Sequence, residues 1–525
     1  MSLDPFRPAN QTIEFVDSAA GSRKTFTAVE KALIAARRRG ARIIFAMPTH
    51  KLIDEMTTHA RLDGKVPVYE ITSRLSNNVV QHICKHVERV KDGHLLFITH
   101  EGLLRVTKWP DEAKDYELYI DEVLDTILNR APFKLRDNHW VLTRFLDAVP
   151  VPATIAERQK AQNNKVVSLK AWKGKKEKEV EPLPFYYHII PKYNVKTKDP
   201  LYWLKRHEYA KQQDDIYTYL DPIAKWLLQG NALFTDANQW NLAQATDPEA
   251  YKSHLRGLIT ITGFRRPDSL KAFKSVTVMS ALFKYTMLYQ VWQQLGVEFV
   301  PSQTVTVNQP TTDLGKRKLK IYWLSNEGWS KRTRDRSGGI TNILNLIKES
   351  NILNPRQPVC VVVNKDDGSE TNPGTVTAVF PKAVVMPNNV RGQNRWRHYH
   401  QLIHCAALNS YTSDIRWMES VLGIDSHYQR LGRTGHEVYQ ALMRLNLRDP
   451  NGKGDIILVV VDKDIAEWLP QWFSPSHQVS VEEIDSNGVI KKKKSQNGRP
   501  PIGEKRMTAA EQKRLWRLNH PKTSV

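Results

Sequence analysis

Residues 13–25, IEFVDSAAGSRKT, carry the pattern that decides the fold of the first half of the chain. An apolar run leads into a loop of small residues, and the loop ends in Lys24 and Thr25. This order predicts a strand, a phosphate-binding loop and a helix over residues 26–38, as in the pattern G-x-x-x-x-G-K-[ST]. Small residues let backbone N–H groups surround phosphates, and the helix adds its positive N-terminal end. In this interpretation Lys24 reaches the β- and γ-phosphates, and the Thr25 hydroxyl holds Mg²⁺.

Two positions of this loop depart from the pattern. Ser18 and Arg23 stand where glycine is usual, and the Arg23 side chain must point away from the loop to leave room for a phosphate. A basic strand-loop-helix that holds no nucleotide is therefore the alternative interpretation. The candidates for nucleotide binding are consecutive, and they are Ala20, Gly21, Ser22, Arg23, Lys24 and Thr25.

An acidic pair supplies the second part of the expected site. The apolar residues 118–120 run directly into Asp121 and Glu122. At the carboxyl edge of a parallel sheet, Asp121 would hold Mg²⁺ together with Thr25, and Glu122 would orient a water molecule. Such a pair alone is usually a solvated strand end. Downstream of a phosphate-binding loop it predicts nucleotide hydrolysis, with ATP and Mg²⁺ as cofactors.

Composition points to a polyanionic partner. The 525 residues carry a formal net charge of +22, with a pI near 9.6. Nucleic acid is the first candidate for such a partner, and an acidic membrane surface is the second. No apolar run is long enough to cross a membrane and no signal-peptide pattern is present, so we expect a soluble, cytoplasmic protein without a membrane partner.

The periodicity predicts an α/β fold with two parallel-sheet domains. Residues 1–315 form the first domain, and residues 316–475 form a second domain without its own phosphate-binding loop. An insertion over about 145–230 interleaves aromatic and basic residues, which fits either a helical subdomain or a stacking surface for a single strand, and we favour the helical subdomain. Residues 476–525 are expected to form a flexible basic tail, because residues 491–525 hold eleven Lys or Arg against two Glu. Such a tail could bind phosphates, or partners in replication or recombination.

Taken in order, these segments resemble the motifs of superfamily-2 helicases of the DEAD/DEAH type, particularly the divergent members carried by phages and mobile elements. SAAGSRKT (18–25) resembles motif I, PTHKLIDE (48–55) motif Ia, THEGLL (99–104) motif Ib, IDEV (120–123) motif II, MSAL (279–282) motif III and NNVRGQNRWRHY (388–399) motif V.

Motif VI fits in two frames, residues 429–436 and residues 440–448. We prefer the second, because it predicts a helix that ends at Arg448 and is followed, after a short turn, by the strand 455–461. Arg444 and Arg448 are four residues apart and would share one face of that helix.

The resemblance implies two RecA-like domains that bind ATP between them and move along nucleic acid. It implies catalytic roles for Lys24, Asp121, Glu122, Arg444 and Arg448, and further nucleotide contacts from Gly392 and Gln440. DNA is the favoured nucleic acid, and RNA is the alternative polymer. The alternative function is that of a nucleic-acid-binding protein with a degenerate, non-hydrolysing loop. The residues implied in nucleic-acid contact are Pro48, Thr49, His50, Thr99, His100, Asn389 and Arg391.

Overall fold

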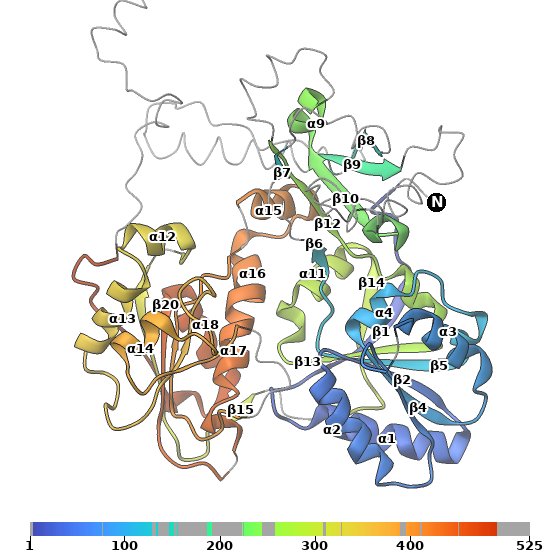
Figure 1. Cartoon of the computed structure of the whole chain (residues 1–525), viewed down its shortest axis with the longest axis horizontal. Coiled ribbons are helices and arrows are strands. Elements are labelled where there is room, and N and C mark those ends of the chain that lie inside the picture. The colour runs from blue at the N-terminus through green and yellow to red at the C-terminus, as the bar shows by residue number, and fades with distance from the viewer. Residues whose placement is uncertain are drawn as a thin grey trace, which may run out of the picture.

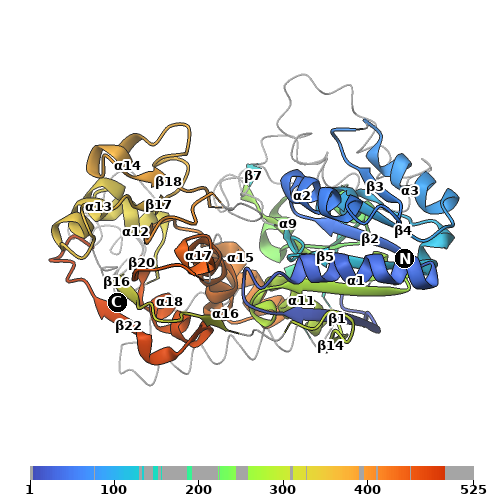
Figure 2. The same cartoon turned by 90° about the horizontal axis from the view of Figure 1, so that it is seen from below.

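The structure of this chain is a computed structural model, and two parallel sheets dominate it (Figure 1). They form two domains that lie side by side, with helices on both faces of each sheet (Figure 2). This arrangement confirms the expected α/β fold with two RecA-like domains. The residues described are 4–75, 77–128, 133–134, 146–151, 155, 186–191, 223, 225–243, 258–307, 311–326, 328–388, 395–409, 412–449 and 451–490.

The first domain is built on a seven-stranded parallel sheet. Its interior strands β2 and β4 are largely apolar runs, RIIFAM and HLLFIT, because a parallel sheet covered by helices is buried on both faces. The strand order is β14 (Val297–Pro301), β1 (Gln11–Asp17), β13 (Ser275–Ser280), β5 (Tyr116–Asp121), β2 (Arg42–Met47), β4 (His94–Thr99) and β3 (Val68–Ile71). The covering helices are α1 (Lys24–Arg39), α2 (His50–Arg61), α3 (Val79–Arg89), α4 (His100–Arg105) and α11 (Met287–Gln294).

The first domain also contains a second sheet, which is antiparallel and to which the insertion contributes β8 and β9. Its strand order is β6 (Ile127–Leu128), β12 (Ile261–Phe264), β10 (Ala232–Asp236), β9 (Tyr186–Pro191) and β8 (Leu146–Pro150). The expectation of a helical insertion is therefore wrong for its described strands, β8 and β9. The run YYHIIP in β9 is aromatic and β-branched, which favours a strand. The aromatic and basic residues between 192 and 222 lie outside the described residues.

The second domain is built on a six-stranded parallel sheet. Its strand order is β18 (Val384–Val385), β17 (Cys360–Val362), β19 (Gln401–His404), β20 (Ile456–Asp462), β16 (Leu319–Ser325) and β22 (Val479–Glu483). The helices of this domain are α12 (Lys331–Arg336), α13 (Ile340–Glu349), α14 (Gly374–Val379), α15 (Thr412–Trp417), α16 (Ser426–Arg430), α17 (His436–Leu442) and α18 (Lys463–Trp468).

Strand β22 corrects the expected start of the tail at residue 476. This strand pairs with β16, and the side chains of Ile484 and Ile490 are buried in the core of the second domain. The alternation Val-Ser-Val within β22 is the period of a strand, and it is the signal that would have extended the domain. The basic residues 491–525 lie outside the described residues.

The two domains are joined by a helical column. Helix α16, the π-helical turn Leu431–Gly435 and helix α17 follow one another without a break and lie between the two sheets (Figures 1 and 2). Ala20 and Ala281 of the first domain belong to the same buried apolar cluster as Tyr439 of this column. The face that holds the loop between β1 and α1 is therefore packed directly against the second domain. None of the helices in the described ranges combines the length and hydropathy that crossing a bilayer requires.

Candidate functional site

The loop between β1 and α1 contains two residues with left-handed backbone, and one of them is Arg23, which stands where the phosphate-binding pattern has a glycine. Gly21 has φ of 86° and Arg23 has φ of 61°, both in the left-handed region. The Arg23 side chain is exposed, and its guanidinium carbon lies 5.6 Å from the centre of the Phe26 ring. It therefore points away from the loop, as the sequence analysis required. The left-handed backbone at Arg23 costs about 1 kcal/mol relative to glycine.

The start of helix α1 is suited to an anion. The helix is 16 residues long, and its first turn contains no acidic residue. Lys24, its first residue, is buried with 6% of its surface exposed, and it interacts electrostatically with Asp17 and Asp121. The positive helix end and the lysine charge are therefore directed at the same small region.

The acidic pair lies beside this helix end. The Thr25 hydroxyl donates a hydrogen bond of 2.6 Å to Oδ1 of Asp121. Burial raises the pKa of Asp121 to about 6, with a further contribution from Glu122, while Lys24, Thr25 and Arg444 act in the opposite direction. The buried carboxylate thus lies in a place where a cation would stabilise its charged form.

These residues fit a magnesium ion. The Asp121 carboxylate and the Thr25 hydroxyl are hard oxygen ligands, and Mg²⁺ in nucleotide sites commonly takes few protein ligands and completes its shell with water and phosphate. Among the described residues there is no cluster of three or more His, Cys, Asp or Glu that could hold a metal ion. A magnesium site here would therefore depend on the nucleotide's own oxygens.

Glu122 is held by the strand beside it. Its backbone N–H donates a hydrogen bond of 2.7 Å to the carbonyl of Met279, and its Oε2 accepts one of 3.2 Å from the Ser280 hydroxyl. Glu122 has φ of 63°, so the chain turns sharply directly after β5. Ala281, the residue that directly follows β13, accepts through its carbonyl a hydrogen bond of 3.2 Å from His436 of α17. The acidic pair is thereby linked to the second domain through two residues.

The second motif VI frame faces the phosphate-binding loop. A methyl group built on Gly21 would lie 3.3 Å from Cγ of Arg448, so the stem of this arginine lies over the loop. Burial and the neighbouring Arg444 lower the pKa of Arg448 to about 10, and Glu122 acts in the opposite direction. The second domain therefore brings two arginines to the phosphate-binding loop and the acidic pair.

The helix expected in this frame is shorter than predicted. Helix α17 ends at Leu442, and Arg448 lies in a separate 3₁₀ turn, Asn446–Arg448. The two arginines therefore do not share one α-helical face, although the fold brings both to the site. Gln440 is completely buried, and neither its side-chain oxygen nor its nitrogen has a hydrogen-bond partner among the described residues.

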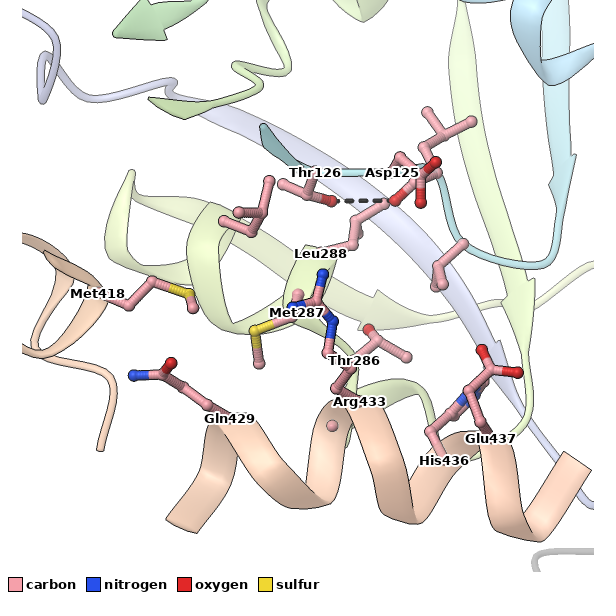
Figure 3. A pocket seen from close by; sticks show the side chains of 14 residues that line it. Asp125, Thr126, Thr286, Met287, Leu288, Met418, Gln429, Arg433, His436 and Glu437 are labelled. Atoms are coloured by element: carbon pink, nitrogen blue, oxygen red, sulfur yellow. Dashed lines mark hydrogen bonds between the residues drawn. The ribbon is translucent and has the colours of Figure 1, made fainter. Parts of the chain in front are cut away.

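The first motif VI frame lies elsewhere at the domain interface. Gln429, Arg433 and His436 line a cavity of about 140 Å³ together with Asp125 and residues of α11 (Figure 3). Arg433 interacts electrostatically with Asp414, Asp125 and Glu437, and burial lowers its pKa. This cavity contains no residue of the phosphate-binding loop. Among the described residues, Arg433 of the first frame (429–436) thus lines a separate cavity, whereas Arg448 of the second frame (440–448) lies at the loop between β1 and α1.

The residues expected at nucleic acid have structural contacts of their own. Thr49 caps α2 by accepting a hydrogen bond from Leu52 N–H, and Thr99 caps α4 by accepting one from Gly102 N–H. Pro48, His50 and His100 are half-buried next to them. The ends of β2 and β4 are paired at Met47 and Thr99, so these residues gather at one edge of the sheet. Asn389, Arg391 and Gly392 lie outside the described residues.

One residue at the site was missed by the sequence analysis. The Tyr439 hydroxyl accepts a hydrogen bond of 3.2 Å from the backbone N–H of Ala20 in the phosphate-binding loop. No local pattern marks this tyrosine, because its partner lies 419 residues away in the sequence.

Comparison with known proteins gives distant structural similarity only. No protein-family model matches the chain, and no curated protein matches it. A structure of S. tokodaii Xpd4 matches 90% of this chain and 96% of its own, at 13% identity and a TM-score of 0.42. The DUF1998 helicase MrfA bound to DNA and AMPPNP has 10% identity and a TM-score of 0.28, and this chain spans 46% of its length while 86% of this chain is covered. S. cerevisiae Dbp5 bound to RNA and ADP BeF3 has 10% identity and a TM-score of 0.33, with 91% of this chain and 86% of that chain covered. At this distance, none of these similarities decides what this chain acts on.

Proposed function

We propose that this chain is an ATP-dependent helicase or translocase that acts on nucleic acid. One observation carries the proposal: Lys24, Thr25 and the acidic pair of one domain face Arg444 and Arg448 of the other. A site assembled from two domains can link nucleotide hydrolysis to their relative movement.

In this proposal each residue of the site has a defined task. Lys24 and the loop N–H groups bind the phosphates, while Thr25 and Asp121 hold Mg²⁺. The ion, when bound, neutralises charge that develops on the phosphate oxygens. Glu122, oriented by Ser280, positions the attacking water. One or both of Arg444 and Arg448 supply positive charge to the transition state from the opposite domain.

The nucleic acid is proposed to be DNA, bound across the sheet edge that carries Thr49 and Thr99 and across residues 389–391 of the second domain. DNA is preferred on the resemblance of the motifs to those of phage and mobile-element helicases. RNA is the alternative, because contacts to a sugar–phosphate backbone do not by themselves distinguish the two polymers.

The test is phosphate release from ATP, measured without nucleic acid, with single-stranded DNA and with single-stranded RNA. We expect release to rise with DNA and to vanish in Lys24→Ala. Lys31→Ala is the matched control, since Lys31 lies on the same helix but contacts the Thr304 carbonyl. Glu122→Gln should bind ATP without hydrolysing it. Absence of release above the Lys24→Ala background, despite tight nucleic-acid binding, would instead support the non-hydrolysing alternative.

A further inference from the structure

A backbone N–H of the loop between β1 and α1 is hydrogen-bonded to a side chain of the other domain. The backbone N–H of Ala20 donates to the Tyr439 hydroxyl at 3.2 Å, and Tyr439 is completely buried. This N–H belongs to the loop whose N–H groups would surround the phosphates of a nucleotide. A tyrosine hydroxyl is an uncharged acceptor, whereas a phosphate oxygen is charged and accepts stronger hydrogen bonds.

Tyr439 is held firmly in this position. Its hydroxyl also lies 3.3 Å from the Thr312 hydroxyl, and its ring centre lies 6.0 Å from that of Phe473. Strand β15 (Thr312–Asp313) pairs with β21 (Phe473–Ser474), so these two neighbours are tied to each other. The hydroxyl therefore cannot leave Ala20 by a free rotation of the side chain. Separation of the two groups requires movement of α17 or of the loop.

The neighbouring position of the loop is also covered. Atoms of the Arg448 side chain lie 3.3–3.7 Å from the position that a Cβ on Gly21 would take. Ala20 is thus hydrogen-bonded to one side chain of the second domain, and the side chain of Arg448 lies next to the following residue, Gly21.

We propose that Tyr439 is a latch that competes with the nucleotide for the Ala20 N–H. The inference rests on the proposed function, because it takes the loop to be the site of the phosphates. A backbone N–H donates one strong hydrogen bond, so the bond to Tyr439 and a bond to a phosphate oxygen exclude each other. Nucleotide binding therefore breaks a contact between the domains. This makes release of α17 from the loop the first step of each cycle, before the arginines close on the phosphates.

The experiment is a titration of the nucleotide-free protein with a fluorescent ATP analogue, in wild type and in Tyr439→Phe. The variant keeps the ring and its packing and removes only the hydroxyl. Loss of a competing hydrogen bond predicts a Kd about fivefold lower. The matched control is Tyr116→Phe, which also removes a buried hydroxyl with hydrogen bonds, to the Val90 carbonyl and His94, in the first domain. The control should leave the Kd unchanged.

A second measurement does not depend on a nucleotide. Hydrogen exchange of a peptide covering residues 18–23 should be faster in Tyr439→Phe than in wild type and Tyr116→Phe. An unchanged or weaker affinity in Tyr439→Phe, together with unchanged exchange, would overturn the latch while leaving ATP binding intact. Absence of binding in both wild type and variant would refute the latch and the proposed function together.

Discussion

Replacing Gly432 by alanine should force the two domains apart on one side of their interface. A Cβ on Gly432 would lie 2.3 Å from the carbonyl oxygen of Tyr285 and 3.0 Å from Cε of Met287. A comfortable contact needs about 3.5 Å, so the helical column must retreat by about 1 Å. Because the Tyr285 carbonyl belongs to the backbone of the other domain, no side-chain rotation relieves the clash.

The size of the effect follows from the bonds that such a shift breaks. A retreat of the column lengthens the hydrogen bond from His436 to the Ala281 carbonyl and the bond from Ala20 to Tyr439, both 3.2 Å long. Each contributes roughly 1 kcal/mol, so the closed arrangement loses about 2 kcal/mol. This corresponds to a roughly 30-fold lower population of the closed arrangement relative to open ones.

Hydrogen exchange of a peptide covering residues 279–287 measures this opening, and phosphate release measures its consequence. We expect faster exchange in the nucleotide-free Gly432→Ala protein. We also expect slower hydrolysis, because a displaced column carries Arg444 and Arg448 away from the loop. The matched control is Gly435→Ala on the same column, where a Cβ would meet the Trp468 ring of its own domain at 3.0 Å. Identical exchange and hydrolysis in the two variants would refute the assignment of Gly432 to a close contact between the domains.

Three further predictions follow from other contacts. Ser280→Ala removes the hydrogen bond to Glu122, and phosphate release should show a kcat lower by about five- to tenfold with an unchanged KM; an altered KM alone would contradict this. Burial lowers the pKa of His404 to about 4, so the unfolded state binds more protons between pH 6.5 and 4, and stability falls by up to ~3 kcal/mol as the pH drops through that range. Between pH 6.5 and 4 the thermal midpoint of His404→Leu should therefore depend less on pH than the midpoint of wild type. An equal pH dependence of the two midpoints would contradict this role of His404. Trp417→Ala removes a fully buried ring that packs against Phe234 and Phe264, and it should destabilise this contact by about 3–5 kcal/mol. Faster hydrogen exchange in β10 and β12 is the readout, and unchanged protection there would refute the packing role.

Local sequence patterns were sufficient to predict which residues of the first domain the fold brings together. The strand, loop and helix around Lys24 and the strand that ends at Asp121 are marked by short apolar runs, loop residues and charges that lie close together in the sequence. Their meeting, through the bond from Thr25 to Asp121, follows from the rule that parallel strands present their carboxyl ends at one edge. The α/β fold class was predictable because it too rests on short apolar runs that lie close together in the sequence.

Other features depend on partners that are distant in sequence. The bond between Ala20 and Tyr439 exists only because one domain lies against the other, and no pattern near either residue marks it. The break in the helix before Arg444 was missed because residues 440–448 contain no Gly or Pro to end it. The strands β9 and β22 did carry local signals, in their β-branched and alternating residues, but these were outweighed by the charged and aromatic residues around them.

The inserted sheet enters and leaves the first domain at neighbouring points. It follows β5 and precedes β13, two strands that lie side by side, and Arg265 N–H closes its base with a hydrogen bond of 2.7 Å to the Thr126 carbonyl. A module attached in this way can be exchanged or lengthened without changing the order of the main sheet. It cannot simply be deleted, because removal would uncover the ring of Trp417 on the second domain. The base of this module and its contact with Trp417 are therefore the parts that any variant of it has to preserve.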